Sequence, residues 1–354
     1  MRIRMASMPL LSLRSFERYS RYVEEILLDV YEEIISAKEP ILKESLLMLE
    51  RNSYRYHLEE FLKIVINFLY FKDEKYLKAY INWRYRLYKS RDIHKKFLYK
   101  ENALLEKIAS HYIKDALNIE ITKLHDYIAM LYDEAQDENS EYLAHKIPEY
   151  TLSLYTLLLQ GEVDALESEI IKNTPTLQSF CQYFTKNISG VLFYIGEQWT
   201  LGGISVAQEH RMSALLKEIL LKTLKNYEPI SMKKEKFALS TIQSETHTLG
   251  REITVQILEK LGYEVVVLGS ELSLKDICNT LYEFRIHHIL FIATLPTNLL
   301  NVAQYIQVTH KEPLLENVQY YAAGGALKTL TNPCESLECD LFFESFEDLY
   351  EKFA

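Results

Sequence analysis

Two hydrophobic patterns divide the chain. From residue 22 to about residue 226, apolar residues recur every three or four positions, as in residues 22–37 and 54–71. This is the period of a helix that buries one face. After the charged linker at residues 233–236, short runs rich in β-branched and aromatic residues alternate with helix-length segments. That alternation predicts a parallel sheet covered by helices.

Five short runs are expected to form the strands of this sheet: residues 237–242, 263–268, 288–293, 318–323 and 340–343. One helix-length segment separates each run from the next, as in a doubly wound, flavodoxin-like fold. Ligands of such sheets bind at the carboxyl ends of the strands. The loops to examine therefore begin near Gln243, Gly269, Thr294 and Gly324.

The distribution of glycine separates the helical part into two blocks. All 10 glycines lie at Gly161 or later, so residues 1–145 are expected to form an uninterrupted all-α bundle. A second helical block covers residues 150–228, and the sheet domain covers residues 236–354. The predicted fold class is thus α plus α/β: an N-terminal all-α bundle, a four-helix cap and a C-terminal flavodoxin-like (Rossmann-like) parallel-sheet domain.

Charge and composition narrow the function. The chain has 40 Lys and Arg residues against 50 Asp and Glu residues, a formal charge of -10, which disfavours binding to nucleic acid. No apolar run approaches the roughly 18 residues that span a bilayer, so we expect a cytoplasmic protein without membrane contact. The cysteines form neither a CxxC pair nor a dense disulfide framework and are expected to be ordinary thiols: Cys181, Cys278, Cys334 and Cys339.

The loop after the first predicted strand carries candidate metal chemistry, because it reads S-E-T-H-T-L-G from Ser244 to Gly250. Glu245 can accept a hydrogen bond from one ring nitrogen of His247, which makes the other nitrogen a better metal donor. Gly250 would allow a bulky group to approach the start of the following helix. The alternative interpretation is a capped turn whose histidine is merely exposed.

This loop resembles the DxHxxG signature of cobalamin-binding domains, here in the form ExHxxG. The resemblance implies that His247 is the lower cobalt ligand and that Glu245 and Gly250 hold the motif's other two positions. The family's contacts to the nucleotide tail of the cofactor correspond to Thr294, Gly324 and Gly325. The sequence departs from the family at Ala293, where the motif has Ser, and an alanine side chain cannot donate that hydrogen bond to the tail.

The segment just before the sheet domain, residues 196–210, reads G-E-Q-W-T-L-G-G-I-S-V-A-Q-E-H. It predicts a helix end, a Gly-Gly turn and a new helix with Val206, Glu209 and His210 on one face. The ordinary interpretation is that Trp199 anchors the turn and that the Glu-His pair is solvated.

This segment also resembles the W-x9-E-H cap of light-sensing cobalamin proteins, a group that includes adenosylcobalamin-dependent carotenoid repressors. The resemblance implies that Trp199, Val206, Glu209 and His210 lie over the upper face of the corrin and hold the adenosyl group. Thr200 stands where the best-understood repressors have a histidine that captures cobalt after illumination. His210 or water is left as the upper ligand in the light state.

The bundle contains a helix, residues 71–88, that resembles the D-x6-Y-x2-W helix upstream of cobalamin domains in standalone sensors. Some of these, the photocobilins, bind biliverdin in a globin-like domain. The resemblance implies a noncovalent biliverdin, since no cysteine precedes Cys181. Its aromatic walls and the partners of its propionates would be Tyr80, Trp83, Arg84 and Arg86. A scaffold or dimerisation bundle is the alternative, because a stripe of aromatic residues is usually core.

Together, these patterns lead us to expect a photoreceptor and not an enzyme, with no catalytic residues. Light would cleave adenosylcobalamin, change the assembly of a homo-oligomer and signal to a separate partner. The alternative is a corrinoid carrier for methyl transfer, which shares the sheet and the His247 loop. The W-x9-E-H segment favours the sensor, because a carrier does not need these residues around an adenosyl group. A scaffold that has lost its cofactor is a third interpretation, which the intact loop disfavours.

Overall fold

The computed structural model describes residues 8–49, 51–114, 116–135, 147–241, 247–269 and 272–354. These residues form two compact units, Met1–Glu138 with Thr200–Gly202, and Asn139–Trp199 with Gly203–Ala354. The predicted cap and sheet segments belong to the same unit, so the predicted division between residues 228 and 236 stays a prediction. Among the described residues, no helix combines the length and the apolar character that crossing a bilayer requires.

The N-terminal unit is entirely helical where it is described, as the sequence predicts. In it, α6 packs against α2 and α7, while α4 packs against α1, α2 and α5. Asp73 starts α5 by accepting a hydrogen bond from the backbone N–H of Tyr76 at 3.3 Å, which satisfies one free donor of the first turn. The helices are α1 Leu13–Arg21, α2 Val23–Ser36, α3 Pro40–Leu49, α4 Arg51–Phe71, α5 Glu74–Lys89, α6 Lys95–Tyr112 and α7 Leu117–Glu134.

The C-terminal unit begins with a four-helix cap, which confirms the prediction from the sequence. Its third helix is continuous from α11 through a π-helical turn, η1, into α12, and its fourth, α13, starts at a capping box formed by Ser205 and Gln208. The elements are α9 Glu149–Gln160, α10 Val163–Asn173, α11 Leu177–Tyr183, η1 Phe184–Ile188, α12 Ser189–Thr200 and α13 Val206–Lys225.

The described part of the sheet has five parallel strands in the order β2-β1-β3-β4-β5. This is the flavodoxin-like order, and the strands differ from the predicted runs only at their ends. All five residues of the central strand β3 are buried, as expected where helices cover both faces. The strands are β1 Lys236–Thr241, β2 Glu264–Leu268, β3 His288–Ile292, β4 Gln319–Ala323 and β5 Leu341–Phe343.

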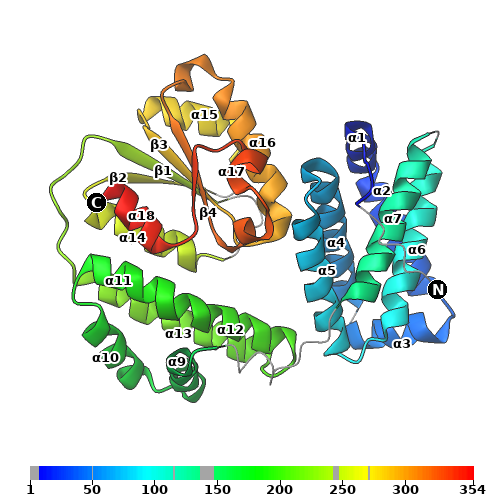
Figure 1. The fold of residues 1–354 in the computed structure, drawn as a ribbon, viewed down its shortest axis with the longest axis horizontal. Helices are drawn as coiled ribbons and strands as arrows, with labels where there is room; N and C mark the ends of the chain where they lie inside the picture. The colour runs from blue at the N-terminus through cyan, green and yellow to red at the C-terminus, as the bar shows by residue number, and fades with distance from the viewer. Residues whose placement is uncertain (1–7, 50, 115, 136–146, 242–246, 270–271) are drawn as a thin grey trace. The chain divides into compact units, whose positions relative to one another are not determined.

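Helices cover both faces of the sheet (Figure 1). On one face lie α14 and α18, and on the other α15, α16 and α17. Short 3-10 turns follow β3 and β4 and precede β4. The bounds are α14 Leu249–Lys260, α15 Leu274–Glu283, η2 Pro296–Asn298, α16 Leu299–His310, η3 Pro313–Leu315, η4 Gly325–Thr329, α17 Pro333–Leu337 and α18 Phe346–Phe353.

The cap and the sheet share one hydrophobic core. In this core, α13 packs on α14, and α11 packs on α18. The ring of Phe184 in η1 meets the ring of Phe346 in α18 edge-on, with centroids 4.6 Å apart. Buried residues continue without a break from α9 through α14 to β1, β3 and β4. The cap is therefore fixed on the α14 and α18 side of the sheet.

Burial makes His125, in α7 of the N-terminal unit, a pH-sensitive point. Its Nδ1 lies 2.8 Å from Asn102 Oδ1, and the Asn102 side-chain N–H donates to the His125 carbonyl oxygen at 2.8 Å. The amide oxygen is therefore an acceptor, and the ring donates through Nδ1. Tyr19 Oη lies 3.5 Å from the other ring nitrogen. Burial lowers the pKa of His125 from 6.5 to about 3, because the charged ring would lose its hydration.

We predict that this histidine destabilises the N-terminal unit in mild acid. The unfolded chain protonates the ring below pH 6.5 and the folded chain does not, so stability is lost as the pH falls through 6.5. The loss at pH 5 should be about 2 kcal/mol. Urea unfolding at pH 7 and pH 5, followed by hydrogen exchange in α6 and α7, should show this loss in the wild type and not in His125→Gln. His111→Gln, an exposed control, should behave as wild type, and equal pH dependence in all three proteins would refute the prediction.

Candidate functional site

The strand order places the candidate site at the carboxyl edge of β1 and β3. The connections from these neighbouring strands leave in opposite directions, which is where sheets of this kind bind ligands. The loop after β1, including Glu245, lies outside the described residues. His247 is described and is exposed, two residues before the first turn of α14. The structure thus places His247 at the carboxyl edge of the sheet, and its role as a cobalt ligand stays a prediction.

The start of α14 is open to a ligand. Thr248 is the N-cap residue, and Gly250 lies in the first turn. A methyl group on Gly250 would meet no atom of the described residues within 4 Å. The approach of a bulky group at Gly250, which the sequence suggested, stays a prediction.

The loops after β3 and β4 contact each other closely. The Ala326 N–H donates to the Ala293 carbonyl oxygen at 3.2 Å. Gly324 has φ +117° and a Cβ there would collide with the same carbonyl oxygen, so only glycine fits. Thr294 is half-buried and Gly325 is exposed. The packing of the two loops therefore explains Gly324 without a ligand, whereas Gly325 and Thr294 remain candidates for ligand contact.

The other half of the candidate site is the first turn and a half of α13. Val206 is 53% exposed, and the His210 ring lies outside the core with its Nε2 3.4 Å from Glu209 Oε2. Glu209 also accepts a hydrogen bond from the Ser213 hydroxyl at 2.9 Å. The structure therefore brings these three side chains together at an accessible helix start, on the face that the spacing predicted.

Trp199 is half-buried against the shared core, next to the buried polar residue Gln198. The side chain of Gln198 is buried, and its Nε2 has no hydrogen-bond partner among the described residues. Its backbone carbonyl accepts the Gly203 N–H at 2.8 Å and so shapes the Gly-Gly turn. A buried amide donor without a partner costs about 1 to 3 kcal/mol, which an acceptor on a ligand would recover.

A long-range contact links α13 to the His247 edge. Lys217 Nζ donates to Thr248 Oγ1 at 2.9 Å and to Glu252 Oε1 at 2.6 Å. Lys217 lies seven residues after His210, which is two helical turns and about 10 Å along the same face. Because Lys217 contacts the residue that follows His247, that face of α13 continues past the start of α14. The sequence did not predict this contact, because Lys217 and Thr248 lie 31 residues apart and no local pattern relates them.

The residues proposed for biliverdin lie in α5. Tyr80 is half-buried and stacks on Phe61, with ring centroids 6.2 Å apart, and Trp83 lies next to it at 5.3 Å. Arg86 is half-buried, and its side chain interacts with other residues. These side chains form part of an aromatic cluster, and their role in binding a pigment stays a prediction.

Arg84 is the largest side chain buried in the chain's described part. Its guanidinium lies 2.7 Å from Glu101 Oε2 and donates to Tyr132 Oη at 2.7 Å and Tyr88 Oη at 3.1 Å. Burial alone would lower its pKa, but the Glu101 charge and these tyrosines hold the pKa well above its usual value. A propionate could bind Arg84 only if the pair with Glu101 opened.

We predict that the stability of the N-terminal unit depends on Arg84 and Glu101 being present together. Arg84→Met leaves the Glu101 carboxylate buried without a counter-charge and should cost about 3 to 5 kcal/mol. The double variant Arg84→Met/Glu101→Leu should recover most of this loss. Urea unfolding followed by hydrogen exchange in α5 and α6 measures both, with Arg86→Met as the control. If Arg84→Met lowers the free energy of unfolding no more than Arg86→Met does, the Arg84–Glu101 pair does not stabilise the fold.

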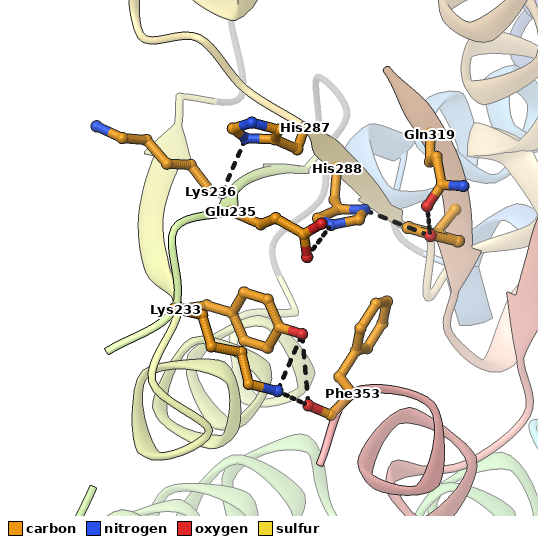
Figure 2. A network of polar contacts seen from close by, with 9 residues as sticks. Lys233, Glu235, Lys236, His287, His288, Gln319 and Phe353 are labelled. Atoms are coloured by element: carbon orange, nitrogen blue, oxygen red, sulfur yellow. Dashed lines mark hydrogen bonds and ion pairs between the residues drawn. The ribbon is translucent and has the colours of Figure 1, made fainter. Parts of the chain in front are cut away.

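A second polar network occupies the opposite, amino edge of the sheet (Figure 2). His288 Nε2 lies 3.3 Å from Glu235 Oε2, and burial lowers the pKa of this ring while Glu235 opposes the shift. Lys233 Nζ donates to the Phe353 carbonyl oxygen at 2.5 Å and to Tyr263 Oη at 3.2 Å. The network anchors the linker before β1 to the last turn of α18. Its place at the amino edge separates it from the candidate site.

Comparisons with known proteins find only distant similarity. No family model matches the sequence, and no curated protein matches it. A cobalamin-binding protein from Desulfitobacterium hafniense DCB-2 is 17% identical over 57% of this chain and 96% of its own, with a TM-score of 0.33. The monomethylamine corrinoid protein of Methanosarcina barkeri is 14% identical over 56% of this chain and 94% of its own, with a TM-score of 0.47.

A third solved structure is the methanol:cobalamin methyltransferase complex of Methanosarcina barkeri. It is 14% identical over 68% of this chain and 99% of its own, with a TM-score of 0.28. At these values the likeness assigns no ligand to this chain, so the functional argument depends on the residues of the site.

Proposed function

We propose that this protein is a light sensor that binds adenosylcobalamin between the start of α13 and the His247 edge of the sheet. The observation that carries the proposal is the Lys217 contact. It joins the helix bearing Val206, Glu209 and His210 to the residue next to His247. Side chains suited to the two faces of one flat ligand therefore come from segments that are held together.

The residues present fit a corrinoid. The ring carries several amide side chains, which offer acceptors to a buried donor such as Gln198 Nε2 and donors to exposed carbonyl groups. The open space at Gly250 gives room for a nucleotide tail. A neutral imidazole is a common ligand of transition-metal ions. His247 is exposed at the edge of the sheet where the corrin ring would lie.

Each side chain has a distinct task in this proposal. His247 would hold the metal through a ring nitrogen. Glu209 and His210 would hydrogen-bond the sugar hydroxyls and base of the adenosyl group, and Trp199 with Val206 would exclude water from it. The cofactor, when bound, supplies a carbon–metal bond that visible light cleaves. Without the adenosyl group, Glu209 would lack this hydrogen-bond partner, which would favour a different packing of the first turn of α13.

The signal would pass to a separate partner through a change in the assembly of identical chains. Biliverdin in the N-terminal unit would extend the absorption to red light, with Tyr80 and Trp83 as its walls. A carrier for methyl transfer remains the alternative. The two differ in the upper ligand that they retain, because a methyl group makes no use of Glu209 or His210 as hydrogen-bond partners.

We predict that His247→Ala removes the nitrogen ligand from the metal. Electron paramagnetic resonance of the Co(II) form should show nitrogen hyperfine splitting in the wild type and lose it in the variant. His287→Ala, a histidine at the amino edge of the sheet, is the control and should leave the splitting intact. Splitting that persists in His247→Ala would show that another group binds the metal.

We predict that Glu209→Ala weakens the binding of adenosylcobalamin more than the binding of hydroxocobalamin. Its removal leaves donors of the adenosyl group unpaired, at a cost of about 1 to 3 kcal/mol, or roughly 5- to 150-fold in Kd. Equilibrium titration of both cofactors measures the difference. Glu218→Ala, an exposed residue of the same helix, should change neither Kd. Equal weakening of both cofactors by Glu209→Ala would mean that Glu209 only supports the fold.

A further inference from the structure

One lysine connects the two halves of the candidate site. Lys217 lies in the middle of α13, and its ammonium reaches the first turn of α14, where it contacts Thr248 and Glu252. The Lys217 and Glu252 side chains are 31% and 33% exposed, so water screens the pair only in part. Burial alone would raise the pKa of Glu252, but the contacts with Lys217 and Thr248 lower it below its usual value.

The contact replaces an ordinary helix cap. Thr248 occupies the N-cap position of α14, yet its side chain caps none of the free N–H groups. Its hydroxyl instead accepts the hydrogen bond from Lys217. A Thr that does not cap its own helix gives up part of the roughly 1 kcal/mol that a cap contributes. The start of α14 is thus fixed by α13.

We propose that Lys217 is a positioning residue that sets the spacing between His247 and the Glu209–His210 pair. By holding Thr248 and Glu252 against α13, it would keep the site open to the thickness of a corrinoid with its adenosyl group. It would thereby favour adenosylcobalamin over corrinoids with small upper ligands. This inference rests on the proposed function.

The reason is geometric. His247 is covalently next to Thr248, while Glu209 and His210 lie two turns from Lys217 on one rigid helix. Without the Lys217 contact, the first turn of α14 loses its polar link to α13, and apolar packing alone then sets its position. Displacements of about 1 Å in such a site can cost on the order of 100-fold in function. A small ligand that does not reach Glu209 and His210 would be insensitive to the same shift.

The test compares Lys217→Met with Lys217→Arg and Lys222→Met in the full-length chain. Lys222 lies on the same helix and pairs with Glu167 of α10 at 2.6 Å, so its variant removes an ion pair within the cap alone. Adenosylcobalamin and hydroxocobalamin are titrated into each protein. Co(II) electron paramagnetic resonance then reports whether His247 still binds the metal.

We expect Lys217→Met to raise the Kd of adenosylcobalamin about 10-fold, with a change for hydroxocobalamin below about 3-fold. The nitrogen splitting should persist. Lys217→Arg and the charge exchange Lys217→Glu/Glu252→Lys should restore much of the preference, which a general loss of stability would not allow. Lys222→Met should match the wild type.

Two failures are distinguishable. If the wild type binds corrinoid and Lys217→Met behaves like Lys222→Met, Lys217 does not position the site and the proposed function stands. If the wild type binds no corrinoid, the proposed function fails, and the inference fails with it. Equal weakening of both cofactors in Lys217→Met would also overturn the inference, because it would indicate a structural ion pair.

Discussion

The packing of the cap against the α14 and α18 side of the sheet is the constraint on which the site depends. One apolar core joins the two, and α13 lies along α14 through much of it. Burial of large apolar side chains contributes about 1.5 to 3 kcal/mol each, so this arrangement is not easily undone. The core therefore determines the position of the first turn of α13. The polar residues of the candidate site lie on this turn, so the core determines their positions as well.

Polar contacts refine the positions that the core sets. Lys217 fixes the start of α14, and the approach of Gly324 to Ala293 brings the loops after β3 and β4 together. At the amino edge, Lys233 anchors the linker to α18. The exposed side chains His247, Val206 and His210 lie at the ends of elements that these contacts hold. Elements that are held rigidly and carry exposed side chains at their ends suit a ligand that is contacted on both faces.

The spacing of apolar residues predicted the helices and strands closely, because an element that buries one face has apolar residues at the period of that element. The parallel sheet was also predicted, since strands that alternate with helices are joined by right-handed crossovers. The Arg84–Glu101 pair and the Lys217–Glu252 pair were not predicted. Each joins charged residues that are far apart in the sequence, and a local pattern shows only a polar position. Arg84 in particular was interpreted as a partner for a ligand, whereas the structure pairs it with Glu101.

The central claim is that the chain holds adenosylcobalamin in a light-sensitive form. The most direct measurement is the absorption spectrum of the purified protein after reconstitution in darkness, recorded before and after illumination with green light. We expect a stoichiometric spectrum of bound adenosylcobalamin that changes irreversibly on illumination, together with a change in oligomeric state by size-exclusion chromatography. A protein that takes up no corrinoid, or whose bound cofactor changes in light without any change in assembly, would contradict the account.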